Sequence, residues 1–98
     1  MVVHVVLMQL RPGVAEIDLS ALGERVRGLA DSIAGPGSSV IGANATDEPL
    51  TQGYEFGFVL RFADRGELDA YHVNPAHLGI SLAIRDLAET VLVFDCAS

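Results

Sequence analysis

The chain has 98 residues, half of them apolar, and a formal net charge of −7, with arginine as its only basic residue besides histidine. That length suits one domain, residues 1–98, and the apolar content excludes a disordered chain. The acidic balance argues against sequence-independent binding to nucleic acid and against docking onto anionic membranes, since both depend on clustered cations.

The single cysteine, Cys96, excludes an internal disulfide and favours a reducing compartment. The apolar start, Met1 to Leu10, lacks the basic segment and the cleavage site of a signal peptide. No run approaches the roughly 20 apolar residues that span a bilayer. We therefore expect a cytoplasmic protein, and the arginine-only, Ala- and Gly-rich composition points to a GC-rich bacterial source.

The first half of the chain predicts two strands separated by a helix. Val2–Leu10 is rich in β-branched residues and stops at the turn signal Arg11-Pro12-Gly13. Over Asp18–Ala34 the apolar side chains fall on one helical stripe, formed by Leu22, Val26, Leu29 and Ile33. Ser38–Ala45 has the character of a second strand, and Thr46–Gly53 is polar and rich in turn residues, which predicts a loop.

A third strand and a short helix follow. Tyr54–Ala63 alternates, with its phenylalanines and Leu60 on one face, which is typical of a strand that packs on a core. Asp64 and Glu67 form an acidic variant of the capping box and open a helix that runs to about His72.

The last segments complete the fold prediction. Pro75 begins another helix, which runs to about Glu89, and Thr90–Cys96 closes the chain as a fourth strand. The order is βαββαβ, with the second helical region broken at Asn74-Pro75. This order predicts an α+β, ferredoxin-like domain: a four-stranded antiparallel sheet with helices on one face.

The first and the last predicted strands carry apolar side chains on both faces. In the first strand Val2, Val6 and Met8 share a face with His4, whereas Val3, Val5 and Leu7 point the other way. In the last strand Val91 and Val93 lie on one face, and Leu92 and Phe94 lie on the other. Helices on one face of the sheet cannot cover both sets, and leaving one set in water would be costly. We therefore expect a homodimer in which a second copy of the sheet buries the other face.

The stretch from Tyr71 to His77 gathers a phenol and two imidazoles, groups that exchange protons near neutral pH. Tyr71 follows Leu68 by three residues and should point inward. His77 lies on the stripe of Ile80 and Ile84, in the first helical turn, where the helix dipole favours a neutral imidazole. His72 lies about 100° further round its helix than Tyr71, so we expect it to face water and to have no role.

These side chains predict a pocket between sheet and helices. His4 lies on the helix-facing side of the first strand, together with Val6 and Met8, and Gly79 lies beside His77. We expect all four to contact a ligand. The alternative is structural: an imidazole bonded to a backbone carbonyl, a buried tyrosine with its hydroxyl satisfied, and a histidine with local hydrogen bonds only.

Other chemistries find less support. The three histidines and the remote cysteine show no metal-ligand spacing, the serines lack a nucleophile-elbow context, and the glycines form no phosphate-binding motif. Gly57 and Gly79 either leave room for a ligand or permit close packing. We expect neither a metal nor another cofactor.

Residues spread over nearly the whole chain match the pattern of one family: Val3-His4-Val5-Val6-Leu7, Pro12-Gly13, Gly42, Asn44, Gly53-Tyr54, Phe62, Tyr71, Pro75-Ala76-His77 and Phe94-Asp95. In their order and spacing the chain resembles the stress-responsive A/B barrel (Dabb) family. The resemblance implies a dimer of ferredoxin-like subunits whose sheets pack face to face into an α+β barrel, in agreement with the two-faced strands.

Through Tyr71, Pro75-Ala76-His77-Leu78-Gly79 and His4 the chain is also similar to olivetolic acid cyclase, a plant member that closes a linear tetraketide by aldol condensation without a cofactor. That similarity implies that His77 takes a proton from an activated methylene, that Tyr71 holds the histidine or the enolate by a hydrogen bond, and that His4 lines the pocket. Asn74 departs from the family, which usually has a histidine there, and asparagine cannot titrate.

Three functions remain open at this point. The first is a cofactor-free cyclase or isomerase that binds a small hydrophobic or polyketide-like ligand and uses His77 and Tyr71. The second is a non-catalytic, stress-responsive protein in which the same residues stabilise the fold. The third is a dimeric α+β barrel monooxygenase, which the absence of tryptophan disfavours. An open cavity of a few hundred Å³ beside Tyr71 and His77 would favour ligand binding.

Overall fold

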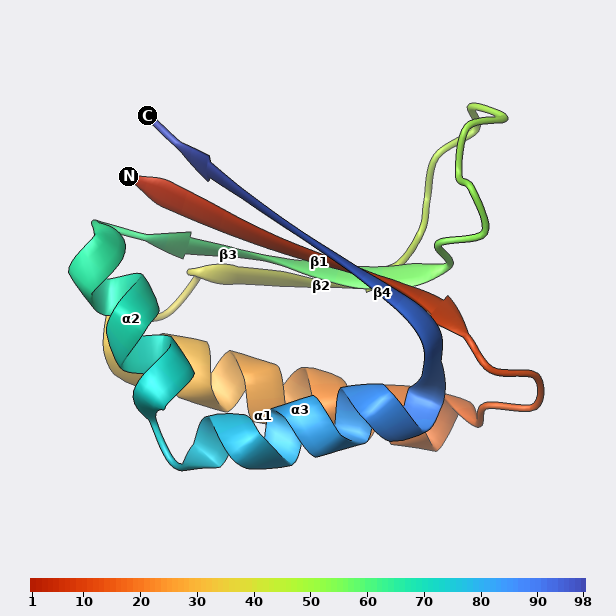
Figure 1. Ribbon diagram of the computed structural model, residues 1–98, viewed down its shortest axis with the longest axis horizontal. Coiled ribbons are helices and arrows are strands. Elements are labelled where there is room, and N and C mark those ends of the chain that lie inside the picture. Colours follow the sequence, from red (N-terminus) through yellow and green to blue (C-terminus); the bar gives the residue numbers. More distant parts are fainter.

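Three helices cover one face of a four-stranded antiparallel sheet in the computed structural model, which describes residues 1–98 (Figure 1). The elements are β1 (Val2–Leu10), α1 (Glu16–Ala34), β2 (Ser39–Ala43), β3 (Phe56–Phe62), α2 (Arg65–Val73), α3 (Ala76–Leu87) and β4 (Ala88–Ala97). The strand order is β2-β3-β1-β4, and every neighbouring pair is antiparallel. The predicted ferredoxin-like βαββαβ fold is confirmed, with its second helical region divided into α2 and α3.

The predicted element boundaries differ most around the loop between β2 and β3. The two strands are shorter than the predicted 38–45 and 54–63 because Asn44 turns the chain away from the sheet. Its side-chain amide donates to the carbonyl oxygen of Tyr54 (2.9 Å), and its Oδ1 accepts from the backbone N–H of Thr46 (2.9 Å). Such Asx bonds compete with the strand ladder. Near the same end of the sheet, α1 begins at Glu16 rather than Asp18. No helix combines the length and apolarity needed to cross a membrane.

Local hydrogen bonds set the break between α2 and α3. Asp64 caps α2 by accepting from the backbone N–H of Glu67 (2.9 Å), while the Glu67 carboxylate accepts from the N–H of Ala63 (2.7 Å). At the other end of α2, Asn74 adopts the extended conformation usual before proline, and its Oδ1 accepts from the N–H of Ala76 (2.9 Å). The non-titrating residue at position 74 therefore shapes the turn that folds α3 back beside α2.

The alternation predicted for β1 is present in the structure. Val2, His4, Val6 and Met8 are buried under the helices, and Leu22, Val26 and Leu29 of α1 join the same core. Val3, Val5 and Leu7 lie on the opposite face and are only partly covered. Any pocket between the sheet and the helices α2 and α3 is therefore bounded on one side by the helix-facing side chains of β1.

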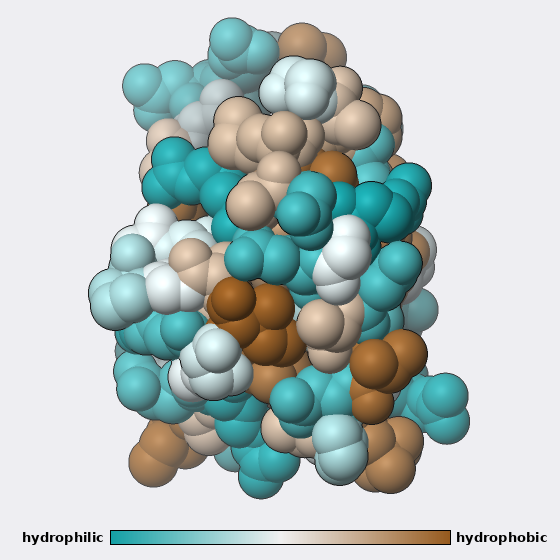
Figure 2. Space-filling model, turned by 90° about the vertical axis from the view of Figure 1, so that its left-hand side faces the viewer, coloured by the Kyte–Doolittle hydropathy of each residue, from teal (hydrophilic) through white to brown (hydrophobic).

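The opposite face of the sheet has no helix over it (Figure 1). Its centre is an apolar row that crosses all four strands in the order Val40, Val59, Val5 and Phe94. Val40 is 61% exposed and Phe94 58% exposed. We call this row and its neighbours Leu7 and Leu92 the outer sheet face. By contrast, Figure 2 shows that the end of the molecule with α2 has only small brown islands among hydrophilic groups.

The last helix and the last strand join without a loop. α3 ends at Leu87 and β4 begins at Ala88, which is buried. The backbone N–H of Arg11 donates to the carbonyl oxygen of Leu87 (2.9 Å), and the Arg11 guanidinium donates to that of Arg85 (3.3 Å). The junction is therefore fixed to the end of β1.

Candidate functional site

Four rings from three elements meet between the sheet and the helices. His4 comes from β1, Tyr71 and His72 from α2, and His77 from α3. Ring centroids lie 5.0 Å apart for Tyr71 and His77, 5.1 Å for His72 and His77, 5.1 Å for His4 and His72, and 6.0 Å for His4 and Tyr71. The structure thus brings together the three site residues predicted around this pocket, His4, Tyr71 and His77, and adds a fourth ring.

The rings open onto a pocket of about 230 Å³. Its polar lining consists of His4, Tyr71, His72, His77 and Ser81, and its apolar lining of Val6, Phe58, Ile80, Ile84, Val91 and Val93. None of the lining residues is an arginine or a carboxylate. No three His, Cys, Asp or Glu side chains are placed to hold a metal ion. The pocket suits a small, neutral, mostly apolar molecule that offers one or two hydrogen-bonding groups.

A carboxylate that the sequence did not single out for the site orients His4. The imidazole is 3% exposed, and its Nδ1–H donates to Oδ1 of Asp95 at 2.5 Å. His4 and Asp95 lie directly opposite each other in the β1–β4 ladder. This bond fixes the ring and leaves Nε2 as the free nitrogen. The sequence held one signal for this contact: Asp95 is the lone acidic residue within an apolar strand, and the ferredoxin-like order places that strand beside β1.

The Tyr71 hydroxyl is buried and has no hydrogen-bond partner. The side chain is 1% exposed, and burial raises the pKa of the phenol to about 12, so it stays protonated at neutral pH. A buried hydroxyl without a partner costs about 1–3 kcal/mol. A ligand oxygen that accepted this hydrogen bond would recover that free energy on binding.

His77 faces the Tyr71 ring from the first turn of α3. Its Nδ1 lies 3.3 Å from the Ser81 hydroxyl oxygen, one helical turn later. When Nδ1–H donates to Ser81, Nε2 presents a lone pair to the pocket. Burial, and then the neighbouring His72 and His4, hold the pKa of His77 below 6.5. The imidazole is therefore neutral at pH 7 and able to accept a proton, and burial and its neighbours account for this more directly than the helix dipole.

His72 joins this cluster, although we expected no role for it from the sequence. It is exposed, as predicted, but its ring lies 5.1 Å from those of both His4 and His77, so it is part of the cluster. Partial burial and the nearby His4 lower the pKa of His72, and Arg65 acts in the same direction, while Asp95 and Asp69 raise it. The angle around α2 predicted the exposure of His72 but not its contact with His77, because that contact depends on how the turn at Asn74 leads from α2 into α3.

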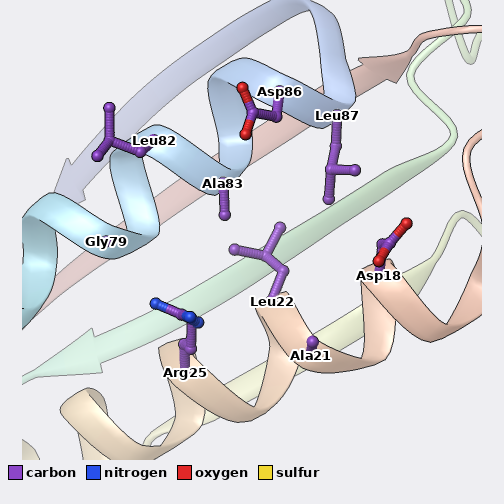
Figure 3. A pocket seen from close by; sticks show the side chains of 9 residues that line it. All are labelled: Asp18, Ala21, Leu22, Arg25, Gly79, Leu82, Ala83, Asp86 and Leu87. Carbon is purple, nitrogen blue, oxygen red and sulfur yellow. The ribbon is translucent and has the colours of Figure 1, made fainter.

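Two other predicted ligand contacts lie elsewhere. Met8 is fully buried in the core and does not reach the pocket that Val6 lines. Gly79 faces a groove of about 480 Å³ between α1 and α3, where Figure 3 shows Arg25 rising from α1 toward it. A Cβ at Gly79 would lie 2.8 Å from an Arg25 guanidinium nitrogen. Gly57 also permits close packing, since a Cβ there would lie 2.7 Å from the carbonyl oxygen of Val6.

The two shifted histidines should make the protein less stable in mild acid. The pKa values of His72 and His77 lie below the unfolded value of 6.5. The folded state therefore binds fewer protons than the unfolded state, and the free energy of unfolding falls as the pH drops from about 7 to about 5. Above about pH 7 these groups add no pH dependence. Urea unfolding at pH 7.5 and at pH 5.5 measures the loss.

The His72→Gln/His77→Gln double variant is the control for this measurement. It lacks both titrating groups and should lose a smaller amount of stability between the two pH values. An undiminished loss in the double variant would assign the effect to other groups.

The fold is shared with several solved structures. A dimeric ferredoxin-like protein of unknown function from Jannaschia sp. CCS1 is 25% identical, with a TM-score of 0.88 over 99% of this chain and 98% of that one. A Dabb family protein from Mesorhizobium loti is 19% identical (TM-score 0.71, 99% and 95%). A hydroxynitrile lyase from Passiflora edulis is 14% identical (TM-score 0.80, 97% and 90%).

The family assignment comes from the sequence. No protein with a curated description matches the chain. The sequence profile of the Dabb family, described as "Stress Responsive A/B Barrel Domain", matches residues 2–98. Both the order of elements and the extent of the match agree with the resemblance seen in the residues. The chain belongs to the stress-responsive A/B barrel (Dabb) family.

Proposed function

We propose that the histidine pocket carries out cofactor-free acid–base chemistry on a small carbonyl compound, as a cyclase or isomerase. The observation that carries the proposal is the Tyr71 hydroxyl, which is buried without a partner and belongs to a ring 5.0 Å from the neutral imidazole of His77. A hydrogen-bond donor and a base beside each other in an apolar pocket are what removal of a proton next to a carbonyl requires.

The proposed reaction begins with the carbonyl oxygen of the substrate accepting a hydrogen bond from Tyr71. His77 takes a proton from the adjacent carbon through Nε2, and the electron pair of the broken C–H bond forms an enolate whose oxygen Tyr71 stabilises. In a cyclase the enolate carbon attacks a second carbonyl of the same molecule, and the proton on His77 passes to the new alkoxide. In an isomerase the proton returns to a different carbon. Neither reaction consumes a co-reactant.

The lining of the pocket limits the substrate class. Without a cation in the lining, a carboxylate, phosphate or thioester carrier has no partner inside it. A volume of about 230 Å³ is below the roughly 300–1,000 Å³ usual for drug-sized ligands. Val91 and Val93 line the pocket yet stay 41% and 58% exposed, so this wall is partly open. We infer a compact, neutral, polyketide-like substrate whose chain can extend past β4.

Hydrogen–deuterium exchange at carbon tests the proposal without knowledge of the substrate. The probe is 1-phenylpropan-2-one in D₂O, and the signal of its methylene protons is followed by NMR. We expect the protein to speed the loss of this signal well beyond the same concentration of free imidazole. A rate equal to that of free imidazole, together with unchanged histidine signals on adding the ketone, would favour the non-catalytic alternative. The Passiflora lyase gives precedent for an enzyme on this fold.

We also propose that the protein is a homodimer closed by the outer sheet face. Val40 and Phe94 are more than half exposed there, although helices bury the other side of the same sheet. Relatives of this fold are described as dimeric. Stable interfaces bury about 800 Å² on each partner, which is within reach of a four-stranded apolar face.

Cys96 is exposed and lies opposite Val3 in the ladder on this side, which fits a reducing compartment such as the cytoplasm.

Replacing Phe94 with aspartate should give a monomer. A carboxylate at the centre of each copy of the face would be buried without a partner, which costs several kcal/mol. Sedimentation velocity at micromolar concentration measures the change. The matched control is Leu78→Asp, which places the same charge on an exposed leucine of α3 and should leave the dimer intact. A wild-type protein that sediments as a monomer would overturn the proposal.

A further inference from the structure

The three imidazoles form a path from the interior to the surface. His4 is 3% exposed, His77 is half-buried, and His72 is exposed and lies in ring contact with both. The rings meet edge to face, and no direct hydrogen bond joins them. A proton can still pass between such rings through one water molecule or by rotation of a ring, because each imidazole can accept on one nitrogen and release from the other.

A bound substrate would cover the pocket-facing side of His77, which is half-buried in the free protein. Its Nε2 faces the ligand, and its Nδ1 faces the part-buried Ser81 hydroxyl. The remaining walls are mainly aliphatic, and the Tyr71 phenol has no polar neighbour to which it could hand a proton. Of the polar side chains that contact His77 in the pocket, His72 is the most exposed, since Tyr71 is buried and Ser81 is part-buried.

We propose that His72 is the proton-exchange residue of this pocket, which carries protons between His77 and bulk water. The proposed cyclase and isomerase steps return the proton of His77 to the substrate, so His72 acts when substrate protons exchange with solvent. That part rests on the proposed function, whereas the proton path itself does not. In the step, the imidazolium of His77 gives the proton that it took from carbon to one nitrogen of His72, through one water molecule or after rotation of a ring. His72 then releases the proton on its other nitrogen to water, and the reverse sequence delivers a solvent proton to His77.

The charges around His72 suit this transfer. His4 from β1 and His77 from α3 face it as imidazoles, while Arg65 on its own helix disfavours an added charge. The carboxylates of Asp69 on α2 and of Asp95 on β4 favour that charge. Because these charges act on the pKa of His72 in opposite directions, the imidazole is neutral between transfers and can still accept a proton during one, as a transfer group must.

Chemical rescue tests the role in the exchange of substrate protons with solvent. In the deuterium-exchange assay at low buffer concentration, His72→Ala should slow exchange about tenfold or more, and added imidazole should restore most of the rate. Val73→Ala, which changes a 79% exposed neighbour on α2, should exchange like the wild type. An unchanged rate in His72→Ala, or a slow rate that imidazole does not restore, would overturn the proposal.

A second measurement keeps the proton path separate from catalysis. Nitrogen-15 NMR of the His77 ring reports how fast it exchanges protons with water, first in the free protein and then with 2,2-dimethyl-1-phenylpropan-1-one, a ketone without an α-proton. His72→Leu should slow this exchange about tenfold, and Val73→Leu should not. If the wild type fails to exchange carbon protons but His72→Leu slows the ring, the enzyme proposal fails and the path stands. If the ring exchange is unchanged, the path fails.

Discussion

Replacing His77 with glutamine is expected to reduce the protein-catalysed deuterium exchange of 1-phenylpropan-2-one by a factor of about 10²–10⁴, the usual contribution of a positioned general base. Glutamine keeps a polar side chain within reach of Ser81, and position 77 is only half-buried, so the fold should persist. The rate is measured by proton NMR in D₂O, and the fold by circular dichroism and sedimentation.

Leu78→Ala is the matched control for His77→Gln. It alters the next residue of α3, which is 65% exposed and does not line the pocket. We expect its exchange rate to equal that of the wild type. Exchange that continues undiminished in a folded His77→Gln protein would remove His77 from the mechanism, and an unfolded variant would assign it a structural role.

Tyr71→Phe should separate activity from stability. Loss of a donor to the developing enolate oxygen is expected to lower the exchange rate about 10²–10³-fold. The free energy of unfolding should stay level or rise, because the missing hydroxyl has no partner and the ring keeps its packing against Phe62 (centroids 5.5 Å apart) and His77. Urea unfolding gives the stability of the same preparation.

The other tyrosine supplies the control for this substitution. Tyr54 precedes β3 and does not line the pocket, so Tyr54→Phe should keep both the rate and the stability of the wild type. If Tyr71→Phe destabilised the protein and left exchange unchanged, the hydroxyl would have a structural partner, and the proposed mechanism would lose its donor.

Much of the fold could be predicted because short-range rules agree with one another. The alternation in Val2–Leu10 placed His4 on the helix-facing side, and helical spacing placed Tyr71 and His77 inward. Each of these predictions needs only the geometry of one element. The ferredoxin-like order then decides which elements face each other, and so brings the three side chains together.

The remaining parts of the site depend on relations between elements. His72 joins the cluster because the turn at Asn74 sets the angle between α2 and α3, which spacing along one helix does not give. Asp95 reaches His4 through the register of β1 and β4. Met8 shares the correct face but lies too far along β1, and the position of Gly79 follows from how α1 packs on α3.

The direct junction of α3 and β4 determines how the pocket can change its size. Two of its walls, the helix with His77 and the strand with Val91 and Val93, are consecutive parts of one chain, and Arg11 anchors their meeting point. They cannot separate there without breaking those backbone bonds. Only the opposite end, at the Asn74-Pro75 turn, offers a hinge. Chain connectivity therefore limits the width of the pocket at the α3–β4 junction, so that a bulkier ligand has to extend past the exposed side of β4 or displace α2.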